Sequence, residues 1–378
     1  MEKELSIQEQ KEKDLTEKIR RKEKEILQRS DKRSDEETEE IVRLSNEHLA
    51  LVEERYKNAS VSGYLGDFMK GIRESAQTPP TSTGFWDLDN QLGGGLYEGL
   101  YTIGAVTSLG KTTLVLQIAD QIAQGGKDVL IFSLEMARTE LMAKSISRHT
   151  LKYTEEHGLP TKYAKTNRGI TDGARYKHYS EKESHVITEA VEEYGKYTDH
   201  LYIYEGIGNI GTKEIREAVE THITRKGEAP IVIVDYLQIL APPDFRMTDK
   251  QATDRNIVEL KRISRDYKTP VIGISSYNRE NYRKGSDSNG AVTLEAFKES
   301  GALEYTSDVA IGLQFAGAGS KDFDLTEAKK KDPRRVELVI LKNRNGKSWG
   351  KVNFTYYPLF NTFKEGKPED EAEPIPIV

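Results

Sequence analysis

Residues 105–113, which read Ala-Val-Thr-Ser-Leu-Gly-Lys-Thr-Thr, constrain the fold of this chain more than any other segment. They follow an apolar run with strand character at residues 99–103 and precede a helix-like stretch at residues 114–123. In that order, a turn of small residues presents backbone N–H groups and a helix N-terminus to phosphate groups. The segment therefore predicts a phosphate-binding loop, with ATP and Mg²⁺ as the expected cofactors.

The side chains of this loop have separate expected roles. Lys111 is expected to bridge the outer phosphates, and Thr112 is expected to ligate Mg²⁺. The first glycine of the usual pattern is replaced by Ala105. A Gly-Lys-Thr turn that arose by chance is the alternative, and the strand, loop and helix order argues against it. The residues expected to contact the nucleotide are Ala105, Ser108, Gly110, Lys111, Thr112 and Thr113.

The composition excludes several classes of protein. The 378 residues include no cysteine, so disulfides and thiolate metal sites are excluded. No apolar stretch near the N-terminus resembles a signal peptide or a membrane span, so we expect a cytoplasmic protein without a membrane partner. The formal net charge of −6 argues against attraction of the whole surface to DNA, although local basic clusters matter more.

Charge and linker residues divide the chain into four expected parts. Residues 1–60 are dense in charge and poor in apolar residues, which predicts a charged helical or partly disordered arm. Residues 61–82 are expected to form a linker helix followed by a Pro-containing linker. Residues 83–366 are expected to form the compact domain, and residues 367–378 an acidic, Pro-containing disordered tail.

Within the compact domain, short β-rich runs alternate with helical stretches. This alternation predicts an α/β fold whose mostly parallel sheet is covered on both faces. The dipeptide Asn345-Gly346 predicts a hairpin, and therefore an antiparallel edge near the C-terminus. The expected strands are residues 100–103, 129–132, 201–204, 231–234, 271–274, 309–313, 336–341 and 352–357.

Two carboxylates follow expected strands at the edge where parallel sheets bind ligands. Glu135 comes after residues 129–132 and is a candidate base for the attacking water, although a surface residue or a helix cap is an equal reading. Asp235 ends the run 231–234, and four apolar residues before an acid form the Walker B pattern, which holds a Mg²⁺-bound water.

Two further polar clusters follow expected strands. Ser276 and Asn278 stand where a γ-phosphate sensor would lie, or they simply end a strand. Lys342 and Arg344 stand at the tip of the expected hairpin. Exposed hairpin cations usually serve solubility, but a cation projected into a neighbouring subunit's nucleotide site would act as an arginine finger.

Taken together, these motifs resemble the C-terminal ATPase domain of DnaB-type replicative helicases, most of all the modules carried by phages, plasmids and conjugative elements. The resemblance covers residues 83–363 and implies a RecA-like P-loop NTPase core. The charged arm stands where that family has a helical collar. The residues that carry the resemblance are the loop 105–113, Phe132-Ser-Leu-Glu-Met136, Val234-Asp-Tyr-Leu-Gln238, 275–279, Lys298-Glu-Ser-Gly-Ala-Leu-Glu304 and Lys342-Asn-Arg-Asn-Gly346.

The resemblance implies a hexameric ring that hydrolyses ATP and moves on single-stranded DNA, with a primase or replication-initiation protein as a partner. It implies that Glu135 activates water and that Lys342 and Arg344 reach the next subunit's nucleotide. It also implies that the helix at residues 61–74 docks on the adjacent subunit. The family's usual sensor glutamine falls on Ser276, so Asn278 is expected to supply the missing contact.

Two stretches are expected to form DNA-binding channel loops, although such loops are often plain solvent-exposed connections. The first, residues 241–250, carries Arg246 and Lys250; the second, residues 279–290, carries Arg279, Arg283 and Lys284.

Residues 149–200 show no motif and are expected to add helices outside the ring. A RecA-fold ATP switch that loads a helicase or mediates recombination without unwinding remains the alternative function, and a fragment that needs absent domains is a third.

Overall fold

The computed structural model describes residues 7–27, 34–75, 79–105, 109–206, 209–277, 291–294 and 301–366. The chain divides into two compact units, Met1–Pro79 and Pro80–Val378. Each unit is described by itself. Among the described residues, no helix is both long and apolar enough to cross a membrane.

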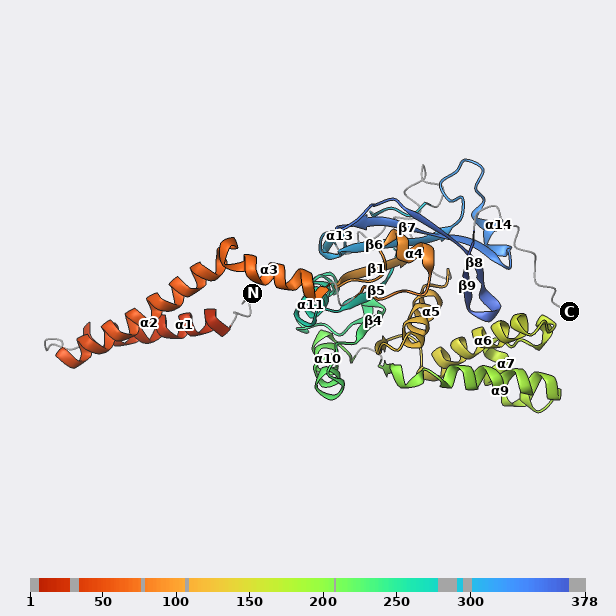
Figure 1. Ribbon diagram of the computed structural model, residues 1–378, viewed down its shortest axis with the longest axis horizontal. Helices are drawn as coiled ribbons and strands as arrows, with labels where there is room; N and C mark the ends of the chain where they lie inside the picture. The colour runs from red at the N-terminus through yellow and green to blue at the C-terminus, as the bar shows by residue number, and fades with distance from the viewer. Residues whose placement is uncertain are drawn as a thin grey trace. The chain divides into compact units, whose positions relative to one another are not determined.

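The first unit contains the helices α1 (Ile7–Leu27), α2 (Asp35–Ala59) and α3 (Val61–Ser75) (Figure 1). A capping box begins α2: the Ser34 hydroxyl accepts a hydrogen bond from the backbone N–H of Glu37, and the Glu37 carboxylate accepts one from the backbone N–H of Ser34, both at 3.2 Å. These bonds satisfy donors that a helix start leaves open, which explains where α2 begins.

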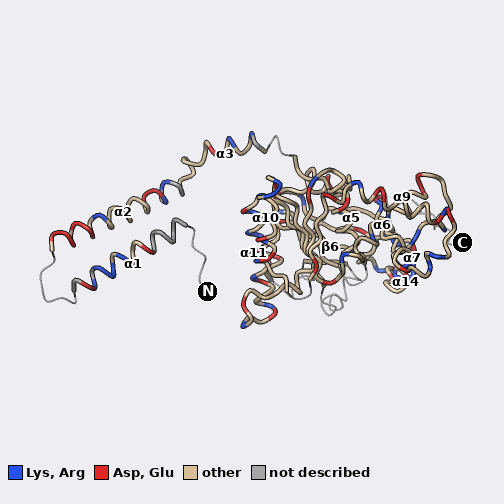
Figure 2. The backbone as a smooth tube through the Cα atoms, turned by 90° about the horizontal axis from the view of Figure 1, so that it is seen from below, with Lys and Arg blue, Asp and Glu red and all other residues tan. Residues whose placement is uncertain are grey.

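Helices α1 and α2 pack against each other as an antiparallel pair. Leu15 of α1 and Ile41 and Leu44 of α2 are buried, and the Thr16 hydroxyl lies 3.1 Å from Nε2 of His48. Acidic residues gather at the start of α2 and basic residues on the second half of α1 (Figure 2), and an ion pair joins the helices there. Opposite charge therefore supplements a small apolar contact.

The second unit is built on a nine-stranded sheet in the order β3-β2-β4-β5-β1-β6-β7-β8-β9 (Figure 1). Neighbours from β3 to β6 in this order are parallel, and neighbours from β6 to β9 are antiparallel. The strands are β1 (Gly99–Ala105), β2 (Val129–Ser133), β3 (Leu201–Glu205), β4 (Ile231–Asp235), β5 (Pro270–Ser276), β6 (Val309–Phe315), β7 (Arg334–Asn343), β8 (Lys351–Tyr357) and β9 (Thr362–Glu365).

Helices cover both faces of this sheet. One face packs against α4, α5 and the start of α6, and the other packs against α10, α11 and α13. Helices α6 and α9 make a further layer beside the sheet. The helices of this unit are α4 (Trp86–Gln91), α5 (Lys111–Gln124), α6 (Arg138–Glu156), α7 (Asn167–Thr171), α8 (Gly173–Tyr176), α9 (Glu181–Gly195), α10 (Thr212–Lys226), α11 (Asp249–Tyr267), α13 (Gly301–Thr306) and α14 (Leu325–Lys330).

The sequence predicts this α/β class, and the prediction is confirmed. Each of the eight expected strands overlaps an observed strand, and residues 344–350 connect β7 to β8 as an antiparallel pair. Strand β9 was not predicted, because its four residues carry too short a pattern to be distinguished from a loop. The inserted helices also begin earlier than expected, at Arg138, because α6 continues directly from the end of β2.

Candidate nucleotide-binding site

The expected phosphate loop joins the end of β1 to the start of α5. Gly110 is the N-terminal cap of α5 with φ at +89°. A Cβ atom added to Gly110 would come within 2.8 Å of Cζ of Tyr356. Glycine is therefore required at this position both by the backbone conformation and by the close approach of a ring. Ser108, another expected contact, lies outside the described residues.

Lys111 folds back over this loop. Its Nζ donates a hydrogen bond to the Ala105 carbonyl over 2.8 Å and another to Oγ of Ser276 over 3.4 Å. Burial lowers the pKa of Lys111 to about 8, although the charges of Asp235 and Glu135 raise it. The lysine thus lies at the helix N-terminus with carboxylates nearby, in a position where phosphate oxygens would replace its present acceptors.

Asp235 ends β4 and is only 5% exposed. Burial raises its pKa to about 6, and a hydrogen bond with the Thr112 side chain lowers it. The Thr112 hydroxyl and this carboxylate form a pair of hard oxygen donors next to the phosphate loop. Oxygen donors of this kind suit Mg²⁺, which keeps several water ligands when it binds a protein.

Glu135 lies two residues beyond β2 and reaches the same edge of the sheet. The backbone N–H of Leu134 donates to the Asp235 carbonyl over 2.8 Å, which continues the parallel pairing past the strand end. The Glu135 side chain is exposed, and its charge acts on the pKa of both Lys111 and Asp235. Glu140, and not Glu135, caps α6, since its carboxylate accepts from the Ala137 N–H over 2.9 Å.

The end of β5 is tied to this site. Oγ of Ser276 accepts from Lys111, and the Tyr277 N–H donates to the Ala105 carbonyl over 3.2 Å. Nε2 of Gln238 donates to Oγ of Ser275 over 2.9 Å. Ser276 therefore lies at the expected sensor position. Four other expected residues lie outside the described part of the chain: Asn278, Arg279, Arg283 and Lys284.

Lys144 was missed by the sequence analysis. It lies on α6, and its Nζ donates to Oγ1 of Thr113 over 3.3 Å and to Oδ1 of Asn361 over 3.1 Å. Burial lowers its pKa, the charge of Arg148 lowers it further, and the charge of Asp235 raises it. Helical spacing after Glu135 was the available signal, but it does not separate this lysine from others on α6.

Lys342 and Arg344 lie toward the opposite edge of the sheet. Asn343 pairs with Val309 at the start of β6, whereas Ala105 pairs with Leu313 near its end. At about 3.3 Å per residue, this difference separates the two levels by about 13 Å along the strands. The structure therefore does not bring these cations to the phosphate loop of their own protomer.

Both cations bind groups near α13. Nζ of Lys342 donates to the Glu304 carbonyl over 2.5 Å, and a guanidinium nitrogen of Arg344 donates to the Tyr305 carbonyl. Arg344 also lies 3.6 Å from Oδ1 of Asp308, and its side chain is 47% exposed. Arg344 is therefore held at the surface and is not enclosed in its own fold.

The first expected channel loop lies between β4 and α11. Arg246 is exposed and pairs with Asp244 across 3.4 Å. Lys250 belongs to the first turn of α11 and is also exposed. The role of these two cations in binding DNA stays a prediction.

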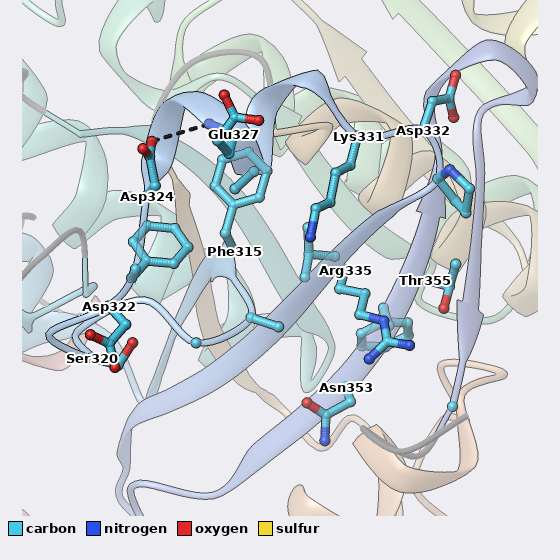
Figure 3. Close-up of a pocket in the computed structure, with 18 residues that line it drawn as sticks. Phe315, Ser320, Asp322, Asp324, Glu327, Lys331, Asp332, Arg335, Asn353 and Thr355 are labelled. Carbon is cyan, nitrogen blue, oxygen red and sulfur yellow. Dashed lines mark hydrogen bonds between the residues drawn. The ribbon is translucent and has the colours of Figure 1, made fainter. Parts of the chain in front are cut away.

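A cavity of about 780 Å³ opens at the ends of β6, β7 and β8. Phe315, Arg335 and Asn353 lie around it (Figure 3), and Phe354 completes its apolar part. This cavity lies at the same edge as the phosphate loop, because Tyr356, two residues along β8 from Phe354, lies against Gly110.

Comparisons with known proteins agree with this geometry. Residues 81–365 match the model of the family described as DnaB-like helicase C terminal domain. The replicative DNA helicase DnaB of Haemophilus influenzae is 26% identical over 305 residues, with 79% of this chain and 58% of the relative covered. The replicative DNA helicase DnaC of Bacillus subtilis is 25% identical, with 74% of this chain and 55% of the relative covered.

Two solved structures share the fold. One is an isolated ATPase domain, which superposes with a TM-score of 0.66 at 23% identity, covering 82% of this chain and 99% of that one. The other is a DnaB-like replicative helicase, studied with its interactions with primase, which superposes with a TM-score of 0.65 at 21% identity, covering 94% of this chain and 75% of that one. The chain spans somewhat more than half the length of the curated relatives.

Proposed function

This chain belongs to the family of DnaB-like helicase C-terminal domains, and from that premise we propose that it hydrolyses ATP to move along single-stranded DNA and separate its strands. We further propose that it works as a hexameric ring in replication in the cytoplasm, in a phage or other mobile element. The observation that carries the proposal is the convergence of Lys111, Asp235 and Glu135 at the carboxyl edge of one parallel sheet.

At this edge the residues divide the work of phosphoryl transfer. Mg²⁺, when bound, would neutralise phosphate charge, and the Thr112 hydroxyl and Asp235 carboxylate would hold it and its water ligands. Lys111 would leave its bond to the Ala105 carbonyl and bind the outer phosphates. The exposed Glu135 carboxylate would accept a proton from the attacking water. Ser276, already bonded to Lys111, would sense the phosphate that leaves.

The charge that develops on the leaving phosphate requires a further cation. Lys342 and Arg344 lie about 13 Å along the strands from their own phosphate loop, at the start of β6. We therefore propose that they act in trans, on the nucleotide bound by the adjacent protomer. Each active site would then form only where two protomers meet.

Helix α3 supplies a surface for ring assembly. Its exposed large apolar side chains need cover from water, and an adjacent protomer is the proposed cover. These side chains are Val61, Tyr64, Leu65, Phe68, Met69 and Ile72.

The cavity between β6 and β8 fits the base of the nucleotide. Phe315 and Phe354 offer aromatic surface for stacking, and Arg335 and Asn353 offer polar groups at the rim. Single-stranded DNA would contact Arg246 and Lys250, together with the cations of residues 279–284. Contacts of this kind are salt-dependent and indifferent to base sequence. A primase or replication-initiation protein is the proposed protein partner.

The direct test is the rate of ATP hydrolysis with and without single-stranded DNA, together with strand separation on a forked duplex. We expect DNA to stimulate hydrolysis, and we expect both activities to be lost in Lys111→Ala. Hydrolysis that ignores DNA, with no strand separation by assembled rings, would contradict the proposal. That result would favour an ATP switch that loads another helicase.

A further inference from the structure

A buried chain of hydrogen bonds crosses β6, β7 and β8 on the face of the sheet opposite α5. The Val292 N–H donates to Oε1 of Gln314 over 2.6 Å, and Nε2 of Gln314 donates to Oε1 of Glu337 over 2.5 Å. Nζ of Lys351 donates to the same Glu337 oxygen over 2.8 Å. Gln314 is 3% exposed and Glu337 is 5% exposed. Each of these polar groups depends on its partner, because water does not replace it.

This chain ends on a backbone segment that lies beside the end of β5. A Cβ atom added to Gly312 of β6 would come within 2.5 Å of Cγ2 of Val292 and within 3.0 Å of the Tyr277 hydroxyl. Val292 and Tyr277 therefore share one small site on β6. They mark the two ends of the intervening stretch, residues 278–291, which carries three of the cations expected to contact DNA.

The two ends of this stretch connect to different parts of the nucleotide machinery. At one end, the Tyr277 N–H bonds the Ala105 carbonyl, the same oxygen that accepts from Nζ of Lys111. At the other end, Val292 connects through Gln314 to Glu337 on β7, the strand that continues to Lys342. One end is thus tied to the phosphate loop and the other to the strand that carries the trans-acting cations.

We propose that Gln314 and Glu337 are positioning residues that couple DNA binding to ATP hydrolysis. The inference rests on the proposed function, in which residues 279–284 contact DNA. When DNA acts on this stretch, the bond from Val292 to Gln314 keeps one end fixed to β6 and β7. The effect of DNA then reaches the phosphate loop through Tyr277 and is not absorbed by movement of the Val292 end.

A purely structural role is the competing explanation, and the two explanations differ in what a substitution changes. Loss of a buried hydrogen bond that serves only stability lowers the unfolding temperature and leaves the ratio of DNA-stimulated to DNA-free turnover unchanged. Loss of a coupling contact lowers that ratio, while turnover without DNA is kept.

The experiment measures ATP turnover of the full chain with and without oligothymidine, together with thermal unfolding, in four variants. Gln314→Leu removes both bonds of the glutamine. Gln314→Glu places two carboxylates against each other. The double variant Gln314→Glu with Glu337→Gln exchanges the pair and keeps every donor and acceptor. Thr269→Val is the matched control, since it removes a buried bond of 2.6 Å to the Pro230 carbonyl at the far edge of the sheet.

We expect stimulation by DNA to fall at least about fivefold in both single variants at position 314, the lower end of ordinary coupling between sites. We expect the exchanged pair and the Thr269→Val control to retain stimulation. Unchanged stimulation in Gln314→Leu, or loss of stimulation in the exchanged pair, would overturn the inference. A wild-type protein that DNA does not stimulate would overturn the proposed function itself, and this coupling with it.

Discussion

The two ends of the parallel strands differ in what they contribute to hydrolysis. At the carboxyl end, Lys111 and Asp235 are buried, and burial shifts the pKa of each toward its neutral form. At the amino end, Arg344 is half-exposed and binds a backbone carbonyl of its own chain. The buried end provides the groups for phosphate and Mg²⁺, and the exposed end provides the cation that a neighbouring protomer requires.

The contacts that hold Arg344 suit a side chain that must change partners. Its ion pair with Asp308 spans 3.6 Å at a half-exposed guanidinium, and exposed pairs of this kind contribute little to stability. Asp308 has a second and shorter partner, since Nζ of Lys261 donates to its Oδ2 over 2.5 Å. The carboxylate therefore stays paired when Arg344 moves away.

The largest effect is expected from Arg344→Ala. Loss of an arginine finger lowers turnover by about a thousandfold or more, while nucleotide binding is kept because the binding groups lie at the other end of the strands. The measurement compares ATP turnover with binding of a non-hydrolysable analogue. Lys347→Ala, on the same connection between β7 and β8, is the matched control and is expected to behave as the wild type. Equal turnover in both variants would remove Arg344 from the mechanism.

The pH dependence of nucleotide binding sharpens the contrast at the carboxyl end. Since burial raises the pKa of Asp235 to about 6, the carboxyl group is mostly protonated below that pH and no longer attracts hydrated Mg²⁺. Affinity for Mg²⁺ and a non-hydrolysable analogue should then fall by up to about tenfold per pH unit. Above about pH 8, Lys111 loses its charge in the free protein, so affinity should be highest between these values.

Asp235→Asn is the control for this profile. The variant binds more weakly, and its affinity should lose the acid-side dependence that the wild type shows beyond the titration of the nucleotide itself. Identical profiles of wild type and Asp235→Asn below pH 6 would show that another group carries the effect.

A smaller effect is expected from Lys144→Met. The substitution removes hydrogen bonds to Thr113 and Asn361 and one positive charge near Asp235. Turnover should fall by about tenfold, the size expected when one charged hydrogen-bond donor next to the phosphates is lost. Lys152→Met, an exposed lysine on the same helix, is the matched control. A fall of equal size in the control would assign the effect to α6 as a whole.

Sequence patterns predicted the groups of the carboxyl end well. Lys111, Thr112 and Asp235 follow short motifs on strands whose apolar runs are unmistakable, so parallel pairing alone brings them to one edge. Lys144 and Tyr356 were beyond this reasoning. Their contacts arise from the packing of α6 and β8 against α5, which no local pattern encodes.

The amino end could be predicted only in part. The expected strands and the Asn-Gly hairpin place Lys342 and Arg344 at the end of β7, but the carbonyl groups near α13 that hold them were not foreseen. The polar pair of Gln314 and Glu337 was also missed. Within β-rich runs such residues read as interruptions of an apolar pattern, and only the observed register brings them together.

The most direct test of the shared site is a mixing experiment with two inactive proteins. Lys111→Ala keeps Arg344 but has no functional phosphate loop, and Arg344→Ala keeps the loop but lacks the cation. We expect rings assembled from an equal mixture to recover part of the wild-type ATP turnover, because some interfaces join an intact loop to an intact arginine. Mixed rings of verified composition that show no turnover above either parent would contradict catalysis across the protomer interface.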